Sequence, residues 1–295
     1  MEGGIGGILV FGSQAGRVQL ANWTPSLYEL SAPVILVSYF FQYMQDYGTD
    51  QVTVQRLLAV KTFRGMVKSV FFNSFIDFFI IVLLTFIGLA LFVYFQQHPE
   101  ALAPGIERNQ ILPFYIMAVL PQGVSGLVIT GIFAAAMSSM DSGINSVTTV
   151  VVNDFIKPLR KQKRDDRSDV RLARKVTLVL GTFATLVSFV VAYIEDILQA
   201  SQTFLGLFSG PVLALFLLGI LTRRANFRGW LIATVLALSI TLWVQIFTEV
   251  HWVWYFLISF TVSTSGGFLF SLLFEEERAD RKLTLWGRSE LGLLE

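Results

Sequence analysis

Long apolar runs separated by short polar segments dominate the chain. A helix needs roughly 20 mainly apolar residues to cross the hydrocarbon core of a membrane. By this measure the sequence predicts seven membrane-spanning helices: Ala32–Tyr47, Val67–Phe95, Val124–Val152, Val176–Ile194, Ile197–Leu221, Gly229–Phe247 and Val253–Phe274. The second and third runs exceed the thickness of the core, so we expect these helices to tilt or bend. Ile111–Leu120 is apolar but too short to span, and we interpret it as an interfacial or re-entrant helix that ends before Pro121.

Composition supports an integral membrane protein. Hydrophobic residues make up 54% of the 295 residues and charged residues only 15%, and there is no Cys. A soluble domain would carry about a quarter charged residues. This balance excludes a nucleic-acid-binding domain and a disulfide-linked scaffold. The sequence also has no Walker loop, nucleophile elbow or triad pattern, so we expect no enzymatic activity and no catalytic residues.

Positive charge alternates along the loops. Lys and Arg gather after the first, third and fifth predicted crossings, whereas the intervening loops contain a single Arg, Arg108, and no Lys. Cytoplasmic loops of membrane proteins carry the excess of Lys and Arg. We therefore expect a plasma-membrane protein with the N-terminus outside and the tail Glu275–Glu295 in the cytoplasm.

An external N-terminus is unusual for this chain, because Met1–Ser31 has no basic segment followed by a signal-like apolar run. We expect that further helices precede this sequence and that the chain is a fragment. The alternative is a genuine external N-terminus that the first helix carries across the membrane.

Small and polar residues recur at intervals of three and four in the third apolar run, which places them on one face of a helix. They are Ala135, Ser138, Ser139, Ser142, Asn145, Ser146 and Thr149. Hydroxyl and carbonyl oxygens suit a hard cation such as Na⁺. The alternative is close helix packing, because small and hydroxyl-bearing residues are common where membrane helices meet. The neighbouring Asp141 favours an ion site, since packing requires no carboxylate.

Two other places carry polar groups within apolar runs. Polar residues and Gly48 interrupt the end of the first crossing, which indicates either part of a substrate path or an ordinary helix end capped by Asp50. In the second crossing, Asn73 and Asp77 lie one helical turn apart. A carboxylate at membrane depth needs a partner, a proton or a ligand. Asp77 is therefore either a substrate contact or half of a structural pair.

Several segments resemble the sodium:solute symporter family. Tyr47–Lys61 (YGTDQVTVQRLLAVK) resembles the sixth core helix of the family and the loop after it, Gly131–Ser146 (GIFAAAMSSMDSGINS) resembles the eighth, and Phe208–Asn226 (FSGPVLALFLLGILTRRAN) resembles the tenth. Leu283–Gly287 (LTLWG) is similar to the C-terminal tails of the family. The resemblance implies an all-α membrane protein with a LeuT-type fold, which consists of two inverted five-helix repeats and flanking helices.

The resemblance also implies the organisation of the chain. Residues 32–226 are expected to hold core helices six to ten, the second repeat of that fold. Residues 227–275 are expected to form two further transmembrane helices. Residues 1–31 then form an extracellular segment, and residues 276–295 form a cytoplasmic tail.

The resemblance implies a sodium site at Ala135, Ser138 and Ser139, which contribute one backbone carbonyl and two hydroxyls. The remaining ligands of that site come from core helix one, which this chain lacks. Asp141 and Ser142 match a second cation site that some members have. Those members have Ser at the position of Asp141, so a proton site is the alternative here.

Five residues are implied to contact the solute. Tyr43, Asp77 and Gln202 match polar contacts of the sugar carriers, and Asp46 and Tyr47 match an aromatic pair at the inner gate. Asp77 stands where the sugar carriers have Lys, and Asp46 replaces an aromatic residue. These carboxylates suit an amine-bearing, zwitterionic or hydroxylated solute.

Taken together, the residues and the resemblance predict sodium-coupled symport of a small organic solute by alternating access. The solute is of the sugar, amino acid, carboxylate or vitamin class, Na⁺ is the coupling ion, and no nucleic acid is involved. The expected partners are the lipid bilayer and the N-terminal helices of the same transporter. The alternatives are a channel, a transporter-like membrane sensor and a truncated module that transports nothing.

Overall fold

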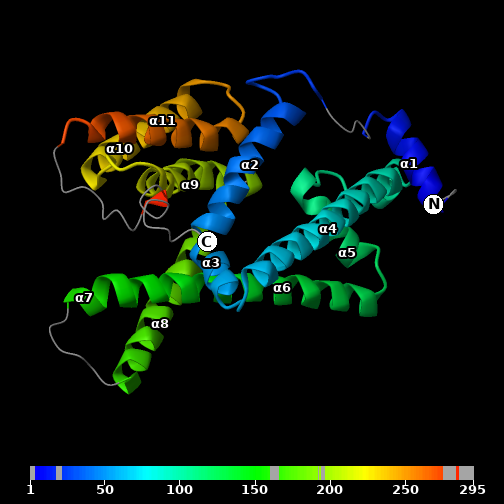
Figure 1. Cartoon of the computed structure of the whole chain (residues 1–295). Helices are drawn as coiled ribbons and strands as arrows, with labels where there is room; N and C mark the ends of the chain where they lie inside the picture. Colours follow the sequence, from blue (N-terminus) through cyan, green and yellow to red (C-terminus); the bar gives the residue numbers. More distant parts are fainter. Residues whose placement is uncertain are drawn as a thin grey trace. The chain divides into compact units, whose positions relative to one another are not determined.

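The computed structural model describes residues 4–17, 22–159, 166–191, 193, 197–274 and 284–285, and these residues form helices and no β-strand (Figure 1). The chain divides into two compact units. Unit 1 comprises Met1–Gln19 and Arg56–Glu195, and unit 2 comprises Leu20–Gln55 and Asp196–Glu295. A short helix, α3 (Gln51–Leu58), spans the boundary between them.

Unit 1 is built on two long helices with shorter helices beside them. Its principal helices are α1 (Gly4–Gln14), α4 (Phe63–Gln97), α5 (Ile111–Ala118), α6 (Gln122–Val150) and α8 (Asp166–Val191). Two 3₁₀ turns (Pro99–Ala101 and Arg108–Gln110) follow α4, while a π-helical segment (Val151–Ile156) and α7 (Lys157–Leu159) continue α6. The sequence did not lead us to expect α1, which packs against α4 where Gly12 approaches Leu89.

Hydroxyl groups fix the ends of the unit 1 helices. The Thr62 hydroxyl accepts a hydrogen bond from the Gly65 amide (3.1 Å) and so caps the start of α4. The Ser125 hydroxyl donates to the Ile116 carbonyl (2.7 Å), which joins α6 to α5. Farther along α6, the Thr148 and Thr177 hydroxyls share a hydrogen bond of 3.1 Å, which joins α6 to α8.

Unit 2 is a closely packed group of helices. It contains α2 (Ala32–Gly48), α9 (Ile197–Leu221), α10 (Phe227–Phe247) and α11 (Val253–Ser271), and α11 contacts the other three (Figure 1). Small residues allow this approach: a Cβ at Gly210 of α9 would lie 2.6 Å from the Phe260 amide of α11. Between membrane helices, close backbone approach of this kind supplies packing energy that the hydrophobic effect does not.

Hydrogen bonds join the helices of unit 2 at both ends. At one end Asn226 caps α10 through the Gly229 amide (2.8 Å), and its side-chain amide donates to the Ser271 carbonyl (3.2 Å). At the other end the His251 amide donates to the Leu27 carbonyl (2.9 Å). The segment before α2 is thereby held against the loop between α10 and α11.

Within the described residues, six helices are long and apolar enough to cross a membrane: Phe63–Gln97, Gln122–Leu159, Arg167–Val191, Gln199–Leu221, Phe227–Phe247 and Val253–Ser271. The predicted all-helical fold is confirmed, and these six helices coincide with the last six of the seven predicted crossings. The first predicted crossing forms α2, which has only 17 residues. The predicted short helix at Ile111–Leu120 forms α5, which ends at Ala118 before Pro121.

One boundary differs clearly from the prediction. The basic segment between the third and fourth crossings was expected to be a loop as far as Lys175, but α8 already begins at Asp166. Arg and Lys are good helix formers, so the helix extends beyond its apolar part. Residues 160–165 of that loop lie outside the described residues, as does the predicted tail 276–295 apart from 284 and 285.

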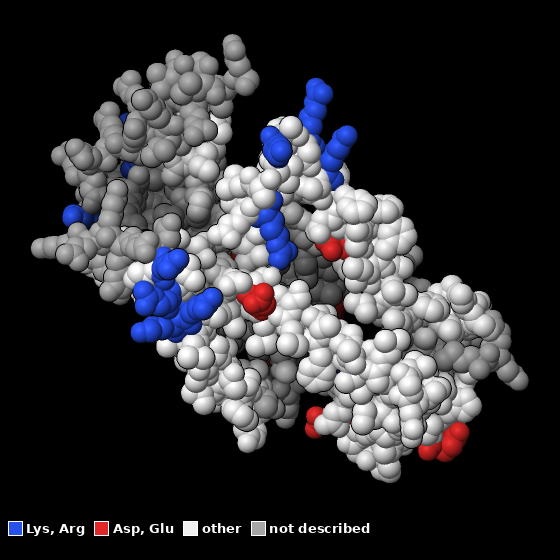
Figure 2. All heavy atoms as spheres, turned by 90° about the horizontal axis from the view of Figure 1, so that it is seen from below, with Lys and Arg blue, Asp and Glu red and all other residues white. Residues whose placement is uncertain are grey.

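The surface suits a lipid environment. Large apolar side chains such as Phe72, Leu84 and Phe183 are more than 60% exposed. Lys and Arg occur in separate groups on an otherwise mostly uncharged face (Figure 2). An apolar surface of this extent is what a bilayer covers.

Candidate functional site

The predicted site residues fall into the two units. Unit 1 holds Asp77 on α4 and the residues of the predicted ion sites on α6, which are Ala135, Ser138, Ser139, Asp141 and Ser142. Unit 2 holds Tyr43, Asp46 and Tyr47 on α2, and Gln202 on α9.

The polar face of α6 is exposed within unit 1. We call Ala135, Ser138, Ser139, Ser142 and Ser146 the α6 polar row. α6 contacts α5 and α8 through residues near its two ends, at Ser125 and Thr148. At 3.6 residues per turn, Ser139 lies on the opposite side of the helix from Thr148. Ala135, Ser138 and Ser139 are exposed, whereas Ser142 and Ser146 are half-buried, so packing inside this unit does not account for the first three residues of the row.

The hydroxyls of the α6 polar row differ in what they bind. The Ser142 hydroxyl donates to the Ser138 carbonyl (3.1 Å) and accepts from the Arg56 guanidinium (3.1 Å). The hydroxyls of Ser138 and Ser139 make no hydrogen bond to another described residue. The Ser138 and Ser139 hydroxyl oxygens therefore remain open to a ligand, while the Ser142 hydroxyl is already engaged by a positively charged group.

Asp141 adds a carboxylate beside this row. It is exposed and forms no ion pair with a described residue. The Arg56 guanidinium binds the adjacent Ser142 instead. The contact between Arg56 and Ser142 was not predicted, because the two residues lie 86 positions apart in the chain.

Asp77 has the partner that its spacing suggests. The side-chain amide of Asn73 donates to Asp77 Oδ2 at 2.8 Å, one turn away on α4. The Asn73 side chain is thus one hydrogen-bond partner of the Asp77 carboxyl group. The Asn73 amide carries no charge, so this pair supplies no counter-ion for the Asp77 side chain.

Three tyrosines follow one face of α2. The ring centroids of Tyr39 and Tyr43 lie 6.2 Å apart, and those of Tyr43 and Tyr47 lie 6.4 Å apart with nearly parallel planes. α2 then ends at Gly48, and Asp50 Oδ1 accepts from the Thr53 amide (3.0 Å) at the start of α3. Asp50 thus caps the start of α3, whereas the C-cap of α2, where the alternative interpretation placed Asp50, is Thr49. Asp46 is half-buried near this end of α2.

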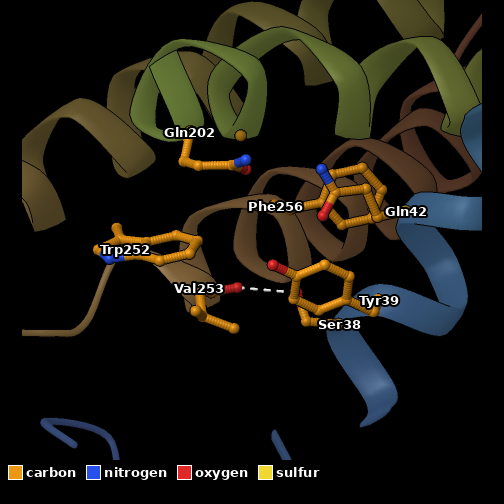
Figure 3. Close-up of a pocket in the computed structure, with 8 residues that line it drawn as sticks. Ser38, Tyr39, Gln42, Gln202, Trp252, Val253 and Phe256 are labelled. Carbon is orange, nitrogen blue, oxygen red and sulfur yellow. Dashed lines mark hydrogen bonds between the residues drawn. The ribbon is translucent and has the colours of Figure 1, made fainter. Parts of the chain in front are cut away.

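Gln202 lies in a pocket that joins three helices. The pocket is lined by Ser38, Tyr39, Gln42, Gln202, Gly206, Trp252, Val253 and Phe256, and we call it the α2–α9–α11 pocket. The side chains of Gln202 and Gln42 point toward its centre from α9 and α2 (Figure 3). Tyr43 does not line it. Sequence reasoning did not select Gln42 or Trp252, although a glutamine inside an apolar helix is a signal that points to Gln42.

A model of the sodium:solute symporter family matches residues 15–237, well over half of the chain. The chain belongs to this family. Together with the six long apolar helices, this membership makes it a multi-pass membrane protein.

The curated relatives that this chain matches are named as transporters. It is 30% identical over 282 residues to the sodium/sialic acid symporter NanT of Aliivibrio fischeri, a match that covers 93% of this chain and 55% of the relative. It is 28% identical over 255 residues to the human sodium-coupled monocarboxylate transporter 1, covering 85% of this chain and 42% of the relative. The chain thus spans about half the length of the curated relatives it matches.

A solved structure extends the comparison to the fold. This chain is similar to the solved structure of a Na⁺-coupled sialic acid symporter in a substrate-bound, outward-open state, with a TM-score of 0.81 and 27% sequence identity. The match covers 94% of this chain and 57% of that structure. This similarity confirms the predicted fold class.

Proposed function

We propose that the complete protein containing this chain is a sodium-coupled symporter of a small organic solute. The observation that carries the proposal is the α6 polar row, whose Ser138 and Ser139 hydroxyls are exposed and bind no described residue. Membership of the sodium:solute symporter family supports it. This chain supplies the second repeat of the fold and two further helices, and it lies in the plasma membrane with its C-terminus in the cytoplasm.

The oxygens of the α6 polar row hold Na⁺ on its way through the protein. Ser138 and Ser139 donate lone pairs from their hydroxyls, and Ala135 contributes its carbonyl. Because Na⁺ gains nothing from sulfur or imidazole ligands, a set made only of oxygens fits it. At 100 mV each Na⁺ that enters gains about 2.3 kcal/mol. Solute accumulation follows if the solute binds better when Na⁺ is present.

The proposal is tested by measuring uptake into proteoliposomes that contain the complete protein. A panel of radiolabelled solutes would include N-acetylneuraminic acid, pyruvate, glucose, proline and pantothenate, with Na⁺ replaced in turn by Li⁺, K⁺ or choline. We expect uptake of at least one solute to require Na⁺. Equal uptake in choline would contradict sodium coupling, and the absence of any uptake by correctly folded protein would favour a sensor or a non-transporting module.

We propose that Asp77 contacts the solute. The substitution Asp77→Asn exchanges the carboxyl group for an uncharged amide of nearly the same size and shape. We expect the KM for the solute to change at least tenfold, while the Na⁺ concentration for half-maximal uptake changes less than about threefold, roughly 0.7 kcal/mol. The matched control is Asp154→Asn, which removes an exposed carboxylate from the π-helical segment. A larger effect on Na⁺ than on solute would place Asp77 in the ion pathway.

We propose that Arg56 limits the occupancy of a second cation site at Asp141 and Ser142. Its guanidinium donates to the Ser142 hydroxyl at 3.1 Å, and a fixed positive charge so close disfavours a second cation. In Arg56→Met we expect a steeper Na⁺ dependence and a half-saturating Na⁺ concentration lowered about threefold or more. Arg64→Met, which removes an exposed charge at the start of α4, is the control. An unchanged Na⁺ dependence in Arg56→Met would show that its charge does not act on this site.

A further inference from the structure

The first part of α8 carries basic side chains on one face. Arg167, Arg171 and Arg174 follow one another at intervals of four and three residues, and Lys175 comes directly after the last of them. At 3.6 residues per turn the three arginines lie within about 60° of arc, with Lys175 at the edge of the same face. All four residues are exposed. We call them the α8 basic face.

The other side of α8 is the side that packs inside unit 1. Asp169 and Val176 lie on that side and are half-buried. The Asp169 carboxylate pairs with Lys157 of α7 at 3.1 Å, and the Thr177 hydroxyl shares a hydrogen bond of 3.1 Å with Thr148 of α6. α8 also contacts the π-helical segment. These contacts fix the rotation of α8, so that the α8 basic face points away from the helices that hold it.

No described carboxylate neutralises the α8 basic face. None of its four side chains forms an ion pair with a described residue. Asp169 is already paired with Lys157, and helix geometry places it across from the arginines. Arg171 Nε donates to the Arg167 carbonyl at 3.4 Å, which leaves the other guanidinium N–H groups available. Four positive charges this close repel one another, so the face favours a bound anion.

The same face of α8 becomes apolar farther along the helix. Leu178 follows the basic residues by one turn and is 71% exposed, and Phe189 on the same side is 66% exposed. Between them, the Thr182 and Thr185 hydroxyls donate to backbone carbonyls one turn back at 2.8 and 2.9 Å, so neither needs water. One continuous face therefore offers positive charge at its start and an apolar surface beyond it.

The apolar part of α8 determines the depth of the basic residues in a bilayer. From Val176 to Val191 the helix is roughly 24 Å long at 1.5 Å per residue, and the hydrocarbon core is about 30 Å thick. Arg174 and Lys175 therefore lie at the boundary of the core, with Arg171 about one turn farther out. The polar headgroups of the lipids occupy this depth.

We propose that the α8 basic face binds the phosphate headgroup of an anionic phospholipid, whose acyl chains lie along Leu178 and Phe189. A planar guanidinium donates two parallel N–H bonds to phosphate oxygens, which is why Arg is favoured at phosphate sites. An anionic lipid supplies both the negative charge and the hydrocarbon that this face lacks. A soluble anion or an acidic protein segment would leave the apolar continuation of the face uncovered.

The test measures binding of a fluorescent phosphatidylglycerol to the complete protein in detergent, beside a phosphatidylcholine with the same fluorophore and chains. We expect phosphatidylglycerol to bind about tenfold more tightly or better. Combining Arg171→Gln with Arg174→Gln should raise its Kd about tenfold or more, because two cations are lost. Combining Arg171→Lys with Arg174→Lys should raise it about threefold, because the charge stays while bidentate donation is lost.

The matched control combines Lys61→Gln with Arg224→Gln. It removes two exposed positive charges from other basic segments, so the net charge falls by the same amount. We expect this variant to bind phosphatidylglycerol as the parent does. Size-exclusion profiles and melting temperatures show whether each variant folds. The pair of Lys substitutions keeps the charge that directs membrane insertion, so it supplies the second measurement if the pair of Gln substitutions does not fold.

Four results would overturn the proposal. Equal affinity for the two lipids, or an equal loss in the control, would show that the basic residues act only through overall charge. Unchanged affinity in the Lys pair would show that the guanidinium groups do not hold the phosphate. Displacement of the lipid by millimolar inorganic phosphate would indicate a site for a soluble anion. Tighter binding of polyglutamate, with loss of the bound lipid, would assign the face to an acidic protein partner.

Discussion

Ser138→Ala and Ser139→Ala are each expected to raise the Na⁺ concentration for half-maximal uptake at least tenfold. Each change removes one proposed oxygen ligand from the α6 polar row, and tenfold corresponds to about 1.4 kcal/mol of binding free energy. Neither hydroxyl bonds another described residue, so no helix contact is lost with it and folding should be unaffected. The measurement is initial solute uptake at saturating solute over a series of Na⁺ concentrations at constant ionic strength.

The control for these variants is Ser239→Ala. Ser239 is exposed on α10 and its hydroxyl donates to the Val235 carbonyl of the same helix at 2.9 Å. We expect this variant to keep the parental Na⁺ dependence. If Ser138→Ala and Ser139→Ala match Ser239→Ala, the α6 polar row is not the ion site.

Gly210→Ala is expected to destabilise the protein by about 1–3 kcal/mol, the usual cost of overpacking a well-packed interface. The added Cβ would meet the Ser259 hydroxyl and lie 2.6 Å from the Phe260 amide. Backbone atoms of α11 cannot move aside as a flexible side chain does, so α9 and α11 must separate. The loss is measured as a lowered melting temperature and a reduced monodisperse fraction in detergent.

Gly219→Ala makes the same change on the same helix and is the matched control. Among the described residues, no heavy atom outside the adjacent backbone of α9 itself lies within 4 Å of a Cβ built there. Because glycine inside a helix is less favourable than alanine by roughly 1 kcal/mol, this variant should be as stable as the parent or slightly more stable. Equal melting temperatures for the two variants would show that α9 and α11 do not pack at Gly210.

The fold was largely predictable because bilayer thickness imposes a length on each apolar run. Six predicted crossings follow directly from such runs. The features that we did not predict are those that the length of an apolar run does not determine. α8 starts at Asp166, inside a basic segment that hydropathy assigns to a loop, and α1 is an 11-residue helix stabilised by its contact with α4.

The candidate site was predictable only along single helices. Spacing of three and four placed Ser138, Ser139 and Ser142 on one face of α6, and the pairing of Asn73 with Asp77 follows from the same geometry. Contacts between helices were not accessible in this way. The Arg56–Ser142 bond joins residues 86 positions apart, and the Ser38–Val253 bond joins residues 215 positions apart. No local pattern encodes such pairs.

The bond between Ser38 and the Val253 carbonyl has a mechanical consequence. Ser38 lies near the middle of α2, whereas Val253 begins α11, which is itself packed along α9 and α10. If α2 tilts in the transport cycle proposed above, it either breaks this bond or carries the start of α11 with it. In the second case the close glycine contacts of α11 with α9 and α10 would pass the displacement on to those helices.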